Sequence, residues 1–95
     1  MRARYQVGVL PQFERDVRDL KKRLPKVYAS VVQAIDLLQR DPYNREHTAN
    51  IRKLEDVPVG DGQYRLRVGD YRLRYDVVDD RVILYSFRLR RESYR

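Results

Sequence analysis

The stretch YRLRVGDYRLRY, residues 64–75, carries alternating arginines on both sides of a Gly-Asp pair. Gly69-Asp70 has the composition of a two-residue type II′ turn, which predicts a β-hairpin in which Val68 faces Tyr71. Counting outward from this pair, Arg67 lies opposite Arg72, and Arg65 lies opposite Arg74. Side chains alternate along a strand, so these four guanidinium groups lie on one face of the hairpin, which we call the arginine face.

The arginine face indicates an anionic partner, because like charges directly opposite each other destabilise a strand pair. Guanidinium groups bind phosphate through paired hydrogen bonds and can stabilise charge that develops on a phosphoryl group. They stay protonated, so they cannot act as a general base. A second basic segment ends the chain and carries Arg88, Arg90, Arg91 and Arg95. The pattern alone is equally compatible with a solvated cationic surface or a protein-docking surface.

Tyr94, in the terminal sequence RRESYR, is the candidate proton-transfer residue near this charge. Neighbouring guanidinium groups can lower the pKa of a phenol, which could then exchange a proton with a substrate, and the ring could stack on a base. The alternative role for this tyrosine is packing. Glu92 could act as a base, although an ion pair with a neighbouring arginine is the simpler interpretation.

Length and composition predict a single domain, residues 1–95, with one hydrophobic core. The chain has 21 Lys and Arg against 14 Asp and Glu, a formal net charge of +7, which favours polyanions or an acidic protein as partner. Cysteine is absent and there is one histidine, so we expect no disulfide, no metal site and no cofactor. No apolar stretch has the length of a signal peptide or a membrane span, and we therefore expect a cytoplasmic protein without a membrane partner.

The hydrophobic pattern predicts the elements that position these residues. Residues 4–9 alternate like a strand, one amphipathic helix follows from Pro11 to Leu24, and a second helix covers residues 27–38. The polar residues 41–62 are expected to form a loop that adds a few apolar side chains to the core. Three strands are then predicted at 63–68, 71–78 and 81–88, of which the last is apolar on both faces and hence internal. The expected fold is α+β, a small antiparallel-rich sheet with a helical hairpin on one face and the arginine face open.

The second half of the chain resembles the RelE/ParE toxin superfamily of type II toxin–antitoxin systems. The resemblance rests on KLEDVPVGDGQYRLRVGDYRLRYDVVDDRVILYSFRLRRESYR, with its Lys-Leu before a loop, its Gly-Asp-Tyr-Arg hairpin and its terminal Arg-Arg-Glu-x-Tyr. The order of one strand, two helices and three strands is also similar to that family, so the likeness extends over nearly the whole chain.

This resemblance implies a ribosome-dependent endonuclease that cleaves mRNA in the ribosomal A site without a metal, as the RelE branch does. By position, it implies basic strand residues at Arg65 and Arg67, a hairpin arginine on the scissile phosphate at Arg72, a tail arginine at Arg90 or Arg91, and a terminal tyrosine at Tyr94. The sequence departs from the family pattern in two ways. It has arginine where the first of these strands often carries lysine, and it lacks the usual histidine before the terminal motif.

The resemblance also implies an antitoxin that wraps the toxin with acidic and apolar groups and carries the DNA-binding part of the pair, so that this chain meets DNA only indirectly. Two other functions fit the same fold. A ParE-like inhibitor of DNA gyrase would need no nuclease chemistry, which suits the shortage of proton-transfer groups. A non-toxic RNA- or protein-binding module would use the arginine face for docking alone.

Overall fold

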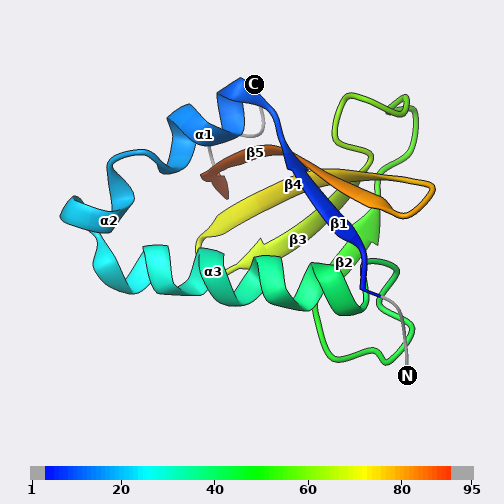
Figure 1. Ribbon diagram of the computed structural model, residues 1–95, viewed down its shortest axis with the longest axis horizontal. Helices are drawn as coiled ribbons and strands as arrows, with labels where there is room; N and C mark the ends of the chain where they lie inside the picture. The colour runs from blue at the N-terminus through cyan, green and yellow to red at the C-terminus, as the bar shows by residue number, and fades with distance from the viewer. Residues whose placement is uncertain (1–3, 91–95) are drawn as a thin grey trace.

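The structure of the protein, a computed structural model, describes residues 4–90. Its five strands form one sheet in the order β1-β5-β4-β3-β2. Along the described chain the elements are β1 (Gln6–Val9), α1 (Pro11–Val17), α2 (Leu20–Arg23), α3 (Pro25–Arg40), β2 (Ile51–Lys53), β3 (Tyr64–Val68), β4 (Tyr71–Val78) and β5 (Arg81–Leu89). In Figure 1, α3 crosses the sheet and α1 lies beside β5. The expected α+β class is confirmed.

The predicted hairpin register is confirmed in full. Arg65 pairs with Arg74 and Arg67 pairs with Arg72, around a turn in which Gly69 has a φ of 58°. A positive φ at the first turn residue is what a type II′ turn requires, and glycine adopts it without strain. β5 is internal, as its two apolar faces predict, because it pairs antiparallel with β4 and parallel with β1.

The hydrophobic core lies between the helices and the other face of the sheet. Phe13 of α1 and Leu20 of α2 are both buried there, together with Leu38 of α3. The prediction of one continuous helix from Pro11 to Leu24 is wrong, because the chain turns at residues 18–19. The continuous helix would allow ion pairs four residues apart between Glu14 and Arg18 and between Asp19 and Arg23, but such pairs stabilise a helix by only a few tenths of a kcal/mol. Packing of α1 on β5 and of α2 on α3 outweighs them.

The segment predicted to be a loop contains a short edge strand, so that prediction is wrong for residues 51–53. Ile51 of β2 pairs with Leu66 and Arg52 pairs with Arg65. Residues 41–50 are also ordered by their own contacts: the carboxylate of Asp41 accepts hydrogen bonds from the amides of Arg45 and Glu46, at 2.9 and 3.0 Å. Three residues of strand are too few to give a recognisable alternation, which is why the sequence did not reveal β2.

The sheet face opposite the core was expected to be open, and it is only partly so. The β2–β3 connection, at the upper right of Figure 1, folds over the far end of this face and buries Asp76 of β4 to 1% exposure. The carboxylate of Asp76 accepts hydrogen bonds from the amides of Gly62 and Gln63, both at 3.0 Å. Within residues 4–90, no helix has both the length and the apolar character needed to cross a bilayer.

Candidate nucleic-acid interface

The arginine face carries two rows of arginines that run across neighbouring strands. Residues paired across antiparallel strands share a face and lie about 5 Å apart. The first row, which we call the hairpin row because it lies next to the Gly69-Asp70 turn, consists of Arg67, Arg72 and Arg88. The second, the loop row, lies two residues further along the strands and consists of Arg52, Arg65 and Arg74.

The hairpin row presents its charge to solvent. Arg67 and Arg88 are exposed and Arg72, between them, is half-buried. The Nε of Arg88 lies 3.7 Å from an oxygen of Asp16 in α1, and the side chain of Arg88 keeps 46% of its surface exposed. Like-charged neighbours of this kind are unfavourable unless an anion lies among them. The row therefore brings three positive charges together on one side of the sheet.

The loop row is held more firmly by its surroundings. Arg65 donates a hydrogen bond from Nη2 to the side-chain oxygen of Asn50 at 3.2 Å. Arg74 donates from Nε to the carbonyl oxygen of Gly62 at 3.0 Å and from Nη2 to that of Asp61 at 2.7 Å. Its guanidinium carbon also lies 5.3 Å from the centroid of the Tyr85 ring. Arg74 thus serves the attachment of the β2–β3 connection.

Sequence reasoning missed Arg52 and Tyr85 on this face. Arg52 is exposed on β2 and extends the loop row to the edge of the sheet. Tyr85 places a phenol ring on the arginine face because the β4–β5 ladder changes register between Arg74 and Tyr75. Arg52 could have been found only by recognising β2. Tyr85 gave no signal in the sequence, because the register change interrupts the alternation of side chains along β5.

The terminal segment is described up to Arg90, which lies next to the turn of the hairpin row. Arg90 is exposed, and its amide donates a hydrogen bond to the carbonyl oxygen of Asp70 at 2.9 Å. The other predicted tail residues, Arg91, Tyr94 and Arg95, lie outside the described residues, as does Glu92.

Groups that could transfer a proton are scarce on the described part of this face. Within residues 4–90, no histidine or lysine of a strand points to this face of the sheet, whose cationic side chains are all arginines. Lys53 points to the opposite face, where its Nζ lies 5.9 Å from the centroid of Tyr64. His47 is exposed in the loop of residues 41–50. The arrangement can bind and stabilise negative charge, and it has little means of general acid–base catalysis.

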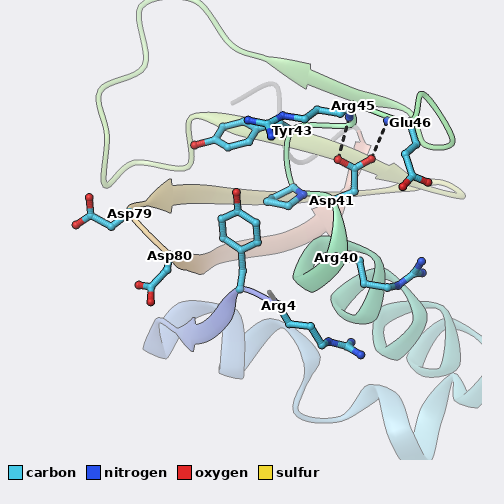
Figure 2. A pocket seen from close by; sticks show the side chains of 10 residues that line it. Arg4, Arg40, Asp41, Tyr43, Arg45, Glu46, Asp79 and Asp80 are labelled. Atoms are coloured by element: carbon cyan, nitrogen blue, oxygen red, sulfur yellow. Dashed lines mark hydrogen bonds between the residues drawn. The ribbon is translucent and has the colours of Figure 1, made fainter. Parts of the chain in front are cut away.

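A pocket of about 570 Å³ opens on another part of the molecule, between the end of α3, the start of β1 and the β4–β5 turn (Figure 2). Its lining has mixed charge, including Asp79 and Asp80 at the turn. Arg4 and Arg40 both pair with Asp36, at 2.7 and 3.2 Å, and the Arg4 hydrogen bond is the main cause that lowers the pKa of Asp36. A polyanion would meet carboxylates here, so the arginine face is the stronger nucleic-acid candidate.

Comparison with known proteins gives a family match over nearly the whole chain. Residues 7–94 match the family described as the ParE toxin of the type II toxin–antitoxin system parDE. No match is found among curated protein sequences.

Solved structures of toxins share the fold. The archaeal RelE–RelB complex from Pyrococcus horikoshii OT3 contains a chain with 28% identity and a TM-score of 0.69, and the match covers 90% of this chain and 94% of that one. The toxin–antitoxin complex RelBE2 from Mycobacterium tuberculosis contains a chain with 26% identity and a TM-score of 0.67, and the match covers 93% of this chain and 100% of that one. The YoeB dimer from Staphylococcus aureus, at 21% identity and a TM-score of 0.74, covers 90% of this chain and 97% of that chain.

Proposed function

Because the chain belongs to the ParE toxin family of type II toxin–antitoxin systems, we propose that it is a toxin that cleaves mRNA in the A site of the ribosome. The observation that carries this proposal is the pair of arginine rows on one sheet face, because two rows about 7 Å apart suit successive phosphates of a single strand. The identity of 26 to 28% with RelE-type chains in two solved toxin–antitoxin complexes supports it.

The hairpin row stabilises the charge of the transition state. Attack of an RNA 2′-hydroxyl on the adjacent phosphate requires activation of that hydroxyl, stabilisation of the phosphorane and protonation of the leaving oxygen. Arg72 lies between Arg67 and Arg88 and supplies the second requirement. In the loop row, Arg52 and Arg65 hold a neighbouring phosphate and set the direction of the strand.

Tyr94 and the tail arginines complete the site. The amide of Arg90 donates a hydrogen bond to the carbonyl oxygen of Asp70, in the turn next to the hairpin row. This contact supports a role for Arg90, or for its neighbour in sequence Arg91, beside Arg72. Tyr94 activates the 2′-hydroxyl. The arginine face offers no clear donor for the leaving oxygen among the described residues, so water must supply this proton. The reaction then depends on strict positioning of the RNA by the ribosome, and cleavage of free RNA is expected to be very slow.

A cognate antitoxin is the second partner. The chains from Pyrococcus horikoshii and Mycobacterium tuberculosis were both solved as toxin–antitoxin complexes. We propose that an acidic segment of such an antitoxin covers the arginine face in the cytoplasm and blocks RNA, with fast and salt-sensitive association. Contact with DNA would then come only through the antitoxin.

The test is expression of the protein alone in a cell, followed by mapping of mRNA 5′ ends in translated and untranslated messages. Breaks confined to translated regions are expected. Intact mRNA on translating ribosomes, in cells that contain folded toxin, would contradict the proposal.

A second candidate is inhibition of DNA gyrase without nuclease chemistry. Two observations favour it. The matching family is described as the ParE toxin. The described part of the arginine face has no proton-transfer groups apart from phenol and hydroxyl side chains and the buried carboxylate of Asp76, which is engaged in hydrogen bonds. DNA damage with continuing translation would identify this function. Harmless expression of folded protein would instead indicate a non-toxic binding module.

A further inference from the structure

A buried carboxylate lies on the face that binds anions in the proposed function. Asp76 is 1% exposed, and it follows Arg74 by two residues on β4, so both side chains point to the arginine face. A buried charge is costly unless hydrogen bonds replace its water. Binding of an anion by the arginine rows does not require a carboxylate at this position, so Asp76 must have another role.

Asp76 and Arg74 together hold residues 61–63 of the β2–β3 connection, and both contact Gly62. The two carboxylate oxygens of Asp76 accept from the amides of Gly62 and Gln63, both at 3.0 Å. Arg74 donates to the carbonyl oxygens of Gly62 and Asp61. These four hydrogen bonds form a clamp in which every bond has a charged partner, the class that is shorter and stronger than neutral bonds.

The clamp also depends on glycine at position 62. Gly62 has a φ of 77°, which residues other than glycine rarely adopt. A Cβ at this position would lie 2.8 Å from the Tyr85 ring and 3.0 Å from the Cβ of Arg74. The backbone thus lies directly on the sheet face. The connection forms a fixed wall beside the loop row.

We propose that Asp76 is a positioning residue that holds this wall and the Arg74 guanidinium at the edge of the arginine face, so that an RNA strand is confined to the two arginine rows. This inference rests on the proposed function, because it assigns the clamp a role in that site. The positioning role and a purely electrostatic role predict opposite effects of removing Asp76. Removal of a carboxylate raises the positive potential of the face and would by itself strengthen binding of a polyanion, whereas loss of the clamp weakens activity.

The test compares Asp76→Asn with Asp79→Asn, which removes the same charge from an exposed turn residue whose positive φ of 54° asparagine tolerates. Arg74→Lys is the second variant, because it keeps the charge but lacks the planar fork that reaches two carbonyls. One readout is hydrogen exchange at the Gly62 and Gln63 amides and at Nε of Arg74. The other is the rate of mRNA cleavage on ribosomes as a function of toxin concentration.

In Asp76→Asn we expect exchange at the three sites to be faster by about tenfold or more. The maximal cleavage rate should fall by about tenfold, with little change in the half-saturating toxin concentration. Arg74→Lys has no Nε to follow, but it should show the same faster exchange at the Gly62 and Gln63 amides and the same fall in cleavage rate. It decides the matter if Asp76→Asn does not fold. Asp79→Asn should match the wild type in both readouts.

Unchanged exchange, or faster exchange with unchanged or faster cleavage, would overturn the positioning role. If the wild type cuts no mRNA, the proposed function fails by itself. Growth arrest then replaces cleavage as the second readout, and full arrest by Asp76→Asn at equal protein level would refute the role of the clamp. Faster exchange with relieved arrest would uphold it.

Discussion

At the scale of single residues, the arginine face is well equipped for one part of the proposed reaction and poorly equipped for another. The guanidinium of Arg72 lies between two others, Arg67 and Arg88, and can stabilise a phosphorane from more than one side. No arginine can transfer a proton in the usable pH range. Catalysis on this face therefore depends on electrostatic stabilisation and on exact placement of the RNA.

Arg72→Ala tests this assignment. Loss of the central guanidinium should reduce mRNA cleavage on ribosomes by about 10²-fold. The free energy of unfolding should change by less than about 1 kcal/mol, because the substitution also relieves repulsion from Arg67 and Arg88. Cleavage is measured by mRNA 5′-end mapping and stability by urea unfolding. Arg18→Ala, at an exposed position between α1 and α2, is the control and should keep full activity.

Tyr75 makes the clearest single contribution to stability. Its hydroxyl donates a hydrogen bond to the carbonyl oxygen of Pro42 at 2.6 Å, and the residue is fully buried. Tyr75→Phe keeps the ring stacked on Tyr64 but leaves a buried acceptor without its donor. We expect a loss of about 1–2 kcal/mol in the free energy of unfolding by urea. Tyr43→Phe, at a residue that is 40% exposed, should cost much less.

The same variant has a pH signature. Burial is the main cause that raises the pKa of Tyr75 above its ordinary value of 10.0, and the nearby Tyr64 adds to it. The unfolded chain therefore releases this proton at lower pH than the folded chain, so stability is full below pH 10.0 and falls as the pH rises further. Tyr75→Phe should lose less stability than the wild type between about pH 9 and 11. An equal loss in both proteins would show that other groups cause it.

The sequence could predict contacts between residues that are close along the chain, but not contacts between distant ones. The pairs Arg65–Arg74 and Arg67–Arg72 follow from a two-residue turn, because register within a hairpin is set locally. The clamp on Asp76 joins residues 13 and 14 positions apart through a connection of irregular backbone. No alternation or spacing encodes such contacts, so Asp76 gave no signal.

At the scale of elements, α1 protects the part of β5 that extends beyond β1. The carboxylate of Asp16 accepts a hydrogen bond from the amide of Phe87 at 2.9 Å and also lies near Arg88. An unpaired strand edge exposes donors that can join another chain. The break between α1 and α2, which helical periodicity did not predict, lets α1 follow β5 while α2 packs on α3.

Asp16→Ala should therefore uncouple α1 from the sheet. The amide of Phe87, a residue that is 2% exposed, would lose its acceptor, and we expect a loss of about 1–3 kcal/mol in unfolding by urea. Asp16→Asn retains an acceptor for this amide but not the charge near Arg88, so it should recover most of the stability. Asp19→Ala is the control, because Asp19 is exposed and makes no side-chain capping hydrogen bond. Equal losses in Asp16→Ala and Asp19→Ala would refute the anchoring role.

At the scale of the whole molecule, a net charge of +7 is distributed so that one face attracts polyanions. The six arginines of the two rows share that face, whereas the pocket in Figure 2 is lined by groups of both signs. Composition predicted the sign of the partner but not the extent of the surface. That extent depends on β2 and on the wall formed by the β2–β3 connection, and neither is visible in the charge pattern.

The salt dependence of binding to a short single-stranded RNA measures this surface. Each phosphate contact adds about −0.7 to the slope of log K against log salt concentration. If all six arginines contact phosphate, the slope should be about −4, and if the clamp retains Arg74 it should be about −3.5. The clamp thus predicts that Arg74→Ala lowers affinity with little effect on the slope, whereas Arg65→Ala reduces its magnitude by about 0.7. Arg18→Ala should change neither quantity. A slope as steep in Arg65→Ala as in the wild type would exclude the loop row from the RNA contact and leave only the hairpin row as the binding surface.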